Sequence, residues 1–262
     1  MEKKIWTITS SIILLFALLS WKTGEKPSRE FYQLTVYHFA GEAQEKMLDN
    51  YFQNALLPSL HRIGLKQVGV FKSWANDTTA NKIICVFIPF KSLEMVTKLP
   101  EKLKTDAAYA AAAAEYTNAS YNSPPYSRIE TILLQAFPLA PQMQLPMLHS
   151  AKKDRVYELR SYESATENKF ENKVDMFNLG DEIGLFKRLN FNAIFYSSVL
   201  AGSKMPNLMY MTSFENKVDR EEHWKTFGSD PYWKKLSAMP QYQNNVLHID
   251  ITFLYPAEYS DF

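Results

Sequence analysis

Hydrophobic and polar residues alternate with a period of two in several short stretches of this chain, and apolar residues recur at helical spacing between them. The alternation is clear in FYQLTVYHF (31–39) and VYELRSYES (156–164), which each predict a half-buried strand. A helix is predicted after both, because apolar residues recur three or four positions apart over 48–63 and over 170–189. Pro58 predicts a kink in the first helix, since proline lacks the backbone N–H that a helix interior uses.

Each predicted helix is followed by the pattern of a β-hairpin. In the first half LKQVGVFKSWA and KIICVFIPF flank the polar turn NDTTAN, and in the second half the hairpin is FNAIFYSSVLAGSKMPNLMYMTSF. The same distance separates Phe90 from Asp106 in the first half and Phe214 from Asp230 in the second. SRIETILLQAF (127–137) and LHIDITFLYP (247–256) predict closing strands. The order strand, helix, strand, strand, helical region, strand therefore occurs twice.

The two halves differ most in their second helical region. The first half has the alanine-rich DAAYAAAAAEY (106–116), which favours a helix through intrinsic propensity. In the second half Asp230 precedes Pro231, a pair typical of a helix start, so we expect Asp230 to be a structural cap.

The repeat predicts an α+β fold. A four-stranded antiparallel sheet with helices on one side leaves its other face to be buried, and a similar domain is the nearest cover. We predict two tandem βαββαβ domains, over 29–137 and 155–262, packed sheet to sheet as an intrachain barrel. The segment 138–154 has three prolines and no periodicity, which indicates a linker.

The N-terminal residues resemble a secretory signal. Lys3 and Lys4 precede the uncharged stretch 5–21, whose continuous apolar core covers 12–19. A membrane-spanning helix needs about 20 predominantly apolar residues, whereas threonines and serines interrupt this short stretch. We predict a signal peptide over 1–28, export to the periplasm or the exterior, and no stable membrane insertion after cleavage. An uncleaved N-terminal membrane tether is the alternative.

Charge and cysteine content narrow the function. The chain has 29 basic and 28 acidic residues, a net charge of +1, and no run of five like charges, so nucleic acid is not an expected partner. Cys85 is the only cysteine, which excludes an intrachain disulfide. Its apolar strand context predicts a buried thiol.

Three motifs in the second half carry a family resemblance. YELRSY (157–162), MYMTSFENKVDR (209–220) and DPYW (230–233) resemble the NIPSNAP family of the dimeric α/β-barrel superfamily. The resemblance covers 156–256 and is looser over 30–137, where Thr35 stands at the position of Arg160 and Ala108 at that of Tyr232. It implies ferredoxin-like sheets that meet as a barrel. One chain carrying both units would be an intrachain pseudo-dimer. Association of several such chains into a homo-oligomer is compatible with this arrangement.

Strand alternation selects the candidate ligand-binding residues. A ferredoxin-like order places the first and last strands of the second half side by side. If the apolar side of each strand faces the helices, the polar side faces the barrel interior. The candidates are Glu158, Arg160 and Tyr162 on one strand and His248 and Asp250 on the other. Such a cluster could hold an anionic or carbonyl-bearing small molecule, with arginine as a planar fork. The alternative is an ion-pair network that seals the two domains together.

A weaker candidate lies on the following helix. Arg220, His223 and Trp224 fall on one helical stripe that points toward the sheet. Haem-binding members of the wider superfamily use a helix histidine, but this chain has no CxxCH sequence, so we predict no cofactor. The histidines form no zinc-binding pair, and glycine-rich phosphate loops and GxSxG are absent from the sequence, so we predict no metal site and assign no catalytic residue.

Two functions are consistent with these residues. The first is an exported module of unestablished biochemical activity that binds a small molecule or a protein. The alternative is a cofactor-independent enzyme, similar to monooxygenases and isomerases of the superfamily, that acts on a small carbonyl or carboxylate compound through Arg160, His248 and Asp250. Thr35 argues against the enzyme, because the first half lacks a matching arginine.

Signal cleavage gives the first testable prediction. We expect the mature chain to begin between about residues 20 and 28 and to be found outside the cytoplasm, because the apolar segment is too short and too polar for a stable span. Cell fractionation followed by N-terminal sequencing measures this. A full-length chain that stays in membranes after a high-salt wash would contradict it.

Overall fold

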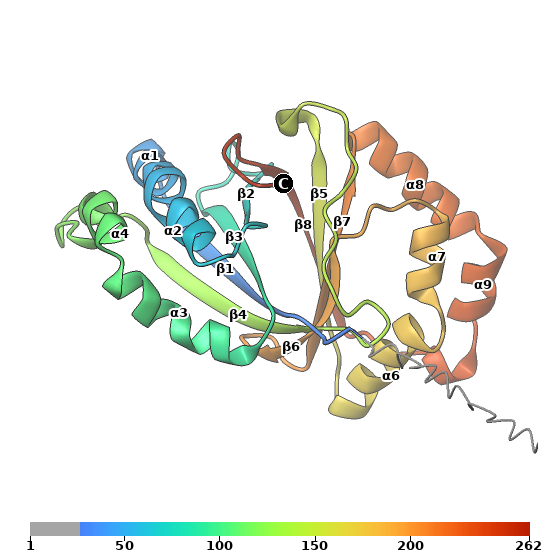
Figure 1. The fold of residues 1–262 in the computed structure, drawn as a ribbon. Coiled ribbons are helices and arrows are strands. Elements are labelled where there is room, and N and C mark those ends of the chain that lie inside the picture. Colours follow the sequence, from blue (N-terminus) through green and yellow to red (C-terminus); the bar gives the residue numbers. More distant parts are fainter. Residues whose placement is uncertain (1–26) are drawn as a thin grey trace, which may run out of the picture.

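The computed structural model describes residues 27–262, and its centre is a closed barrel of eight antiparallel strands (Figure 1). Neighbouring strands follow the order β1-β3-β2-β8-β5-β7-β6-β4, and β4 pairs with β1 to close the ring. The strands are β1 (Phe31–Phe39), β2 (Gly69–Ser73), β3 (Lys82–Phe90), β4 (Arg128–Ala136), β5 (Val156–Glu163), β6 (Phe195–Ala201), β7 (Asn207–Phe214) and β8 (His248–Pro256).

The two halves of the chain contribute strands in the same order. The first half supplies β4-β1-β3-β2 and the second supplies β8-β5-β7-β6. They join where β2 pairs with β8 and where β4 pairs with β6. The predicted α+β class and the barrel formed within one chain are therefore confirmed.

Helices cover the outside of the barrel in two groups, one beside the strands of each half (Figure 1). Each group packs on its own apolar cluster, with Phe52 central in the first and Phe186 in the second. Within residues 27–262, no helix is long and apolar enough to cross a membrane. The helices are α1 (Glu42–Tyr51), α2 (Leu57–Arg62), α3 (Leu93–Thr105), α4 (Ala107–Ala112), α5 (Ala114–Thr117), α6 (Glu167–Asn178), α7 (Glu182–Arg188), α8 (Lys217–Ser229) and α9 (Pro231–Ser237).

Pro58 interrupts the first helical region at the predicted place. A π-helical stretch, Phe52–Leu56, separates α1 from α2, and Pro58 lies in the first turn of α2. The backbone stays helical through Leu56 and Leu57, so the helix is not broken, but Pro58 has no N–H to donate to the preceding turn. The predicted kink thus takes the form of one widened turn.

Asp106 and Asp230 cap corresponding helices of the two halves, α4 and α9. The carboxylate of Asp106 accepts the backbone N–H of Tyr109, and that of Asp230 accepts those of Tyr232 and Trp233. Each is also bound by an arginine at the end of an earlier helix, Arg62 of α2 in the first half and Arg188 of α7 in the second. The structural role predicted for Asp230 is confirmed, and its pKa lies below the ordinary value, chiefly through the hydrogen bond from Arg188.

The barrel interior is an apolar core that both halves share. Phe87 of β3 stacks on Phe195 of β6, with ring centroids 4.8 Å apart and ring planes 10° from parallel. Phe71 of β2 packs against Tyr157 of β5 at 4.9 Å. Aromatic side chains bury about 150–250 Å² each, so these contacts dominate the energetics of the interior. Neither half contains this core alone.

The linker and the C-terminal residues cover one end of the barrel. Met143 and Phe262 belong to the inner cluster, together with Tyr32 and Tyr157 near the starts of β1 and β5. The backbone N–H of Met143 donates to Oε2 of Glu30 at 2.8 Å, which ties the linker to the chain just before β1. Polar residues gather instead at the other end, where β1 and β5 finish. Residues 1–26, which carry most of the predicted signal peptide, lie outside the described part of the chain.

The shared core predicts that the second half is not an independent monomer. A fragment of residues 156–262 should dimerise or aggregate, because it exposes Tyr157, Met211 and Leu254, which are fully buried in the complete barrel. Light scattering after size-exclusion chromatography, with urea unfolding, compares the fragment with the full chain. A monomeric fragment that unfolds cooperatively would show that the barrel is not required.

Candidate functional site

The candidate residues on β5 and β8 lie on opposite faces of the sheet. In the register of these strands, Ser161 is opposite Asp250, whereas Arg160 is opposite Ile251. Directly opposed residues share a face. His248 and Asp250 therefore lie on the barrel face, as predicted, while Glu158, Arg160 and Tyr162 lie on the helix face. The prediction that all five form one site is wrong.

The reason is that the barrel interior is itself a core. It takes the apolar set of β5, Tyr157 and Leu159, into the inner cluster. Strand alternation then places Glu158 and Arg160 beneath α8, which supplies polar partners for them.

Glu158 is at the centre of a buried network. Its side chain is 0% exposed, and its carboxylate accepts hydrogen bonds from Arg220 Nε (2.7 Å), Arg160 Nε (2.6 Å) and Trp224 Nε1 (2.8 Å). Burial acts to raise the pKa of Glu158, but the hydrogen bond from Arg220 and the charges of both arginines outweigh it. The pKa of Glu158 is therefore lowered, and the carboxylate stays ionised.

The guanidinium of Arg160 is occupied by protein groups. Besides its bond to Glu158, Nη1 donates to the hydroxyl of Tyr162 at 3.0 Å, and that hydroxyl is 2.8 Å from the hydroxyl of Tyr210. Its central carbon lies 3.7 Å from the centre of the Trp224 ring. The geometry favours the structural alternative for these residues. The network fastens α8 to β5 within the second half, however, and does not seal the two halves together.

His223 lies on α8 outside the barrel. Its Nδ1 is 2.8 Å from the carbonyl oxygen of Asp219, and its ring packs edge-on against Phe191 and Phe214. The predicted stripe of Arg220, His223 and Trp224 does face the sheet. Its members contribute packing and hydrogen bonds there.

A cavity of about 630 Å³ opens at the polar end of the barrel. It lies between the ends of β1 and β5 and is lined by side chains from both halves. Its apolar wall is formed by Leu34, Val36, Ile83, Cys85, Ile132, Leu159 and Met209, and its polar residues include His38, Glu130, Ser161, Lys204, Asn207, Asp250 and Thr252.

The thiol in this wall is buried, as predicted. Cys85 is 1% exposed, and burial raises the pKa of its thiol to about 12. A neutral thiol is a weak nucleophile, so Cys85 serves here as a small apolar side chain.

Asn207 presents an unsatisfied polar atom in this region. Its Nδ2 donates to Oγ of Ser161 at 2.7 Å, but Oδ1 is buried and has no hydrogen-bond partner among the described residues. A buried acceptor without a partner costs about 1–3 kcal/mol, so a donor that reached it would be favoured.

His38 faces the same cavity from the first half. Its Nδ1 is 3.0 Å from Oδ1 of Asn81, and its Nε2 is 3.3 Å from Oε1 of Glu130 without forming a hydrogen bond. Arg128 also pairs with Glu130, at 2.6 Å. A histidine with a carboxylate neighbour could exchange a proton with a ligand in the cavity.

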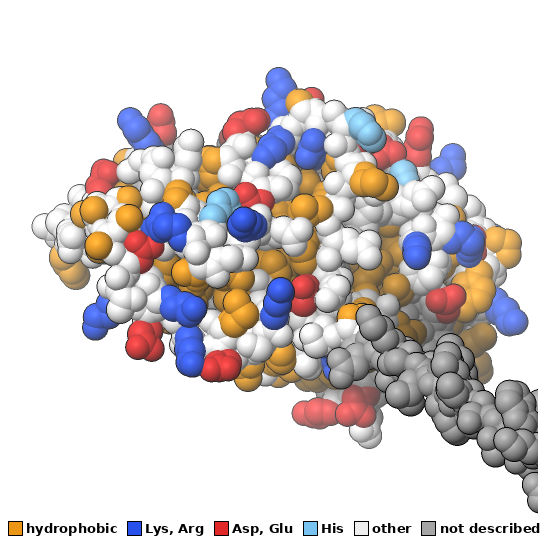
Figure 2. Space-filling view, in the orientation of Figure 1, with side chains coloured by type: hydrophobic (Ala, Val, Ile, Leu, Met, Phe, Trp, Pro, Cys, Tyr) orange, Lys and Arg blue, Asp and Glu red, His pale blue; other side chains and the backbone are white. Residues whose placement is uncertain are grey.

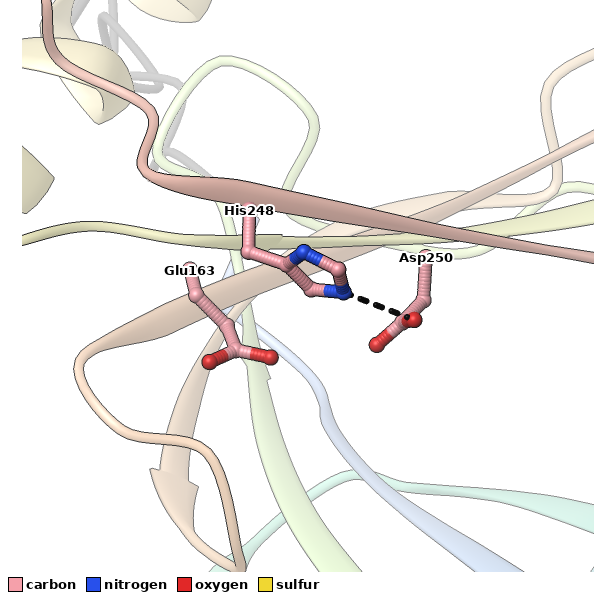
Figure 3. Close-up of side chains that lie close together, drawn as sticks. All are labelled: Glu163, His248 and Asp250. Atoms are coloured by element: carbon pink, nitrogen blue, oxygen red, sulfur yellow. Dashed lines mark hydrogen bonds and ion pairs between the residues drawn. The ribbon is translucent and has the colours of Figure 1, made fainter.

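A second polar cluster forms part of the rim. Glu163, His248 and Asp250 converge from β5 and β8 (Figure 3), and Nε2 of His248 is 3.1 Å from Oδ1 of Asp250. Lys204, from the loop between β6 and β7, pairs with Oδ2 of Asp250 at 2.5 Å.

Sequence reasoning found His248 and Asp250 but missed the rest of this mouth. His38 and Glu163 occupy the same position in the two aligned strands, two residues after their respective Val36 and Ser161. Following the aligned strands to their next inward-facing position would have identified His38 and Glu163 as residues of the mouth. Asn207 and Lys204 had no such signal.

Residues 157–261 match the NIPSNAP family model. The resemblance predicted for the second half is therefore confirmed over the range that holds both polar clusters of β5 and β8. No curated protein sequence matches the chain significantly.

Several solved structures are similar to the chain over both of its halves. A provisionally assigned monooxygenase from Lactobacillus acidophilus is 11% identical, with a TM-score of 0.56, and the match covers 87% of this chain and 94% of that one. One from Fusobacterium nucleatum is 9% identical, with a TM-score of 0.53 and coverage of 87% and 93%. An anthrone oxidase-like protein is 10% identical, with a TM-score of 0.50 and coverage of 88% and 92%. At these identities the likeness shows the fold alone.

The buried network predicts a large effect of Glu158→Gln. We expect the free energy of unfolding to fall by about 3–5 kcal/mol near neutral pH, because Arg160 and Arg220 lose their counter-charge. The folded pKa of Glu158 is depressed, so its contribution is present above the ordinary value of 4.5 and is lost as the pH falls below it. The difference from wild type should therefore shrink in acid.

Urea unfolding followed by tryptophan fluorescence at several pH values measures this difference. Glu222→Gln, at an exposed position of α8, is the matched control and should change stability little. Equal effects of the two substitutions would contradict the structural role of Glu158.

Proposed function

We propose that this chain binds a small organic molecule in the cavity at the open mouth of its barrel. The cavity, at about 630 Å³, supports this because ligand sites usually occupy about 300–1,000 Å³. Its composition also fits, since apolar walls surround a few polar groups that could orient a ligand.

The polar groups favour a particular class of ligand. The unpaired Oδ1 of Asn207 calls for a hydrogen-bond donor, such as a hydroxyl or an N–H group. Glu130 and Asp250 lie at the same mouth with Lys204, which is already paired with Asp250. These carboxylates would repel an anionic ligand. We therefore favour a neutral, largely apolar compound with at least one hydroxyl or amino group over a carboxylate.

We propose that the halves are tandem ferredoxin-like domains, over 29–137 and 155–262, with 138–154 as the linker. The identical strand orders support this organisation. In it the chain is a pseudo-dimer, and the ligand lies between the two domains. Figure 2 shows basic and acidic side chains interspersed on the face in view, which is consistent with a small-molecule partner and not with nucleic acid.

We also propose that the chain is exported through its N-terminal segment. The support is the sequence pattern of residues 1–28. Binding would then take place in the periplasm or outside the cell.

An enzymatic function is the second candidate. His38 beside Glu130 in the cavity favours it, because the pair could move a proton to or from a bound compound. Similar folds include provisionally assigned monooxygenases. Arg160 has no part in this version, since Glu158 and Tyr162 occupy its guanidinium. Consumption of oxygen or of a bound compound, lost in His38→Gln while binding persists, would separate the enzyme from the binding module.

Blocking the cavity tests the binding proposal. We expect phenols and other small hydroxyl or amino compounds to raise the melting temperature of the wild type, and Val36→Phe to reduce that shift by narrowing the cavity. Val218→Phe, on the surface of α8 with 69% exposure, is the control and should leave it unchanged. Asn207→Leu should weaken binding about tenfold through the lost hydrogen bond.

Thermal shift followed by isothermal titration calorimetry measures these effects. Binding that is equally strong in Val36→Phe and the wild type would place the ligand elsewhere. A panel in which no neutral compound stabilises the wild type would count against the proposal itself.

A further inference from the structure

Three potential metal ligands converge on the rim of the barrel mouth. In the β5–β8 register, Glu163 lies directly opposite His248, and Asp250 follows two residues later on the same face. One ligand atom from each side chain lies within 4.8 Å of the other two (Figure 3). Because the backbone pairing of two strands sets these positions, the three side chains are held close whether or not an ion is bound.

The ligand set has a definite chemical preference. One imidazole nitrogen and two carboxylate oxygens suit first-row transition metals, whereas Mg²⁺ and Ca²⁺ prefer oxygen ligands alone. Ligands bound at about 2.1 Å from one ion lie no more than about 4.2 Å apart, so the widest separation here needs only a small side-chain adjustment. The 59% exposure of His248 and 38% exposure of Asp250 leave room for that adjustment and for water as a further ligand.

We propose that Glu163, His248 and Asp250 bind one divalent first-row transition-metal ion. The metal site shares Asp250 with the wall of the cavity, but it needs no organic ligand, so metal binding can be tested without one.

Lys204 is the competitor for this ion. Its ammonium group lies 2.5 Å from Oδ2 of Asp250, and its pKa is raised, chiefly by the hydrogen bond to Asp250 and further by Glu163 and Glu130. Lys204 is 51% exposed and on a loop, so it can move aside when a cation of higher charge arrives. It therefore lowers the affinity of the site without blocking it.

The first half carries no equivalent site. His38 and Arg128 are paired across β1 and β4 as Glu163 and His248 are across β5 and β8. Arg128 thus stands where the second half has an imidazole, and it pairs with Glu130 at 2.6 Å. A guanidinium cannot bind a metal ion. We expect one ion per chain.

Calorimetric titration of the full chain with Zn²⁺ and Co²⁺ tests the proposal. We expect a single ion per chain, with Mg²⁺ and Ca²⁺ giving no comparable heat, and visible absorption from bound Co²⁺. His248→Ala and Asp250→Asn should each weaken Zn²⁺ binding by at least about tenfold. Lys204→Ala should strengthen it, by about tenfold, because it removes a competing positive charge.

His149→Ala is the matched control. His149 is also exposed and lies 3.3 Å from a carboxylate, that of Glu215, but it lacks a third ligand in the structure. Its loss should leave Zn²⁺ affinity unchanged. Zn²⁺ binding that resists His248→Ala, or that falls equally in His149→Ala, would reduce the observation to nonspecific binding at surface histidines. Undiminished Zn²⁺ binding in Asp250→Asn would show that Asp250 is not a ligand.

Discussion

The rest of the structure depends on one constraint: each four-stranded sheet has an apolar face that its own helices do not cover. The two faces are buried against each other when the strands of both halves close into a ring. Closure removes the open sheet edges as well, since β2 pairs with β8 and β4 with β6. Aromatic contacts such as that of Phe87 with Phe195 then tie the halves together.

The same constraint separates the polar residues into two roles. Tyr157 and Leu159 are drawn into the barrel, so Glu158 and Arg160 must find their partners under α8. Apolar packing fills one end of the interior, where the linker and the C-terminus add Met143 and Phe262. The polar inner residues are left at the other end, and it is there that the cavity opens.

Much of the fold could be predicted from the sequence because the pattern is repeated. Alternation in 31–39 and 156–164, helical spacing after each, and the matched aspartates Asp106 and Asp230 correctly indicated two similar halves and an intrachain barrel. Periodicity tells which residues share a face, but it does not tell which face turns inward. Which face turns inward depends on a core formed by both halves. The prediction of an inward-facing side chain was therefore wrong for Arg160 and right for Asp250. Likewise, the meeting of Glu163 with His248 depends on strand register, which a single strand does not reveal.

Because one chain forms both halves of the barrel, the two sides of the mouth can differ in sequence. In a barrel made by two identical subunits, each substitution appears twice, on both sides of the symmetry axis. Here Arg128 and His248 hold corresponding places in one chain and yet differ. A mutation can thus alter one side of the mouth while the other side stays unchanged. This asymmetry lets a single opening combine unlike groups, such as the imidazole of His38 on one wall and the carboxylate of Glu163 on the other.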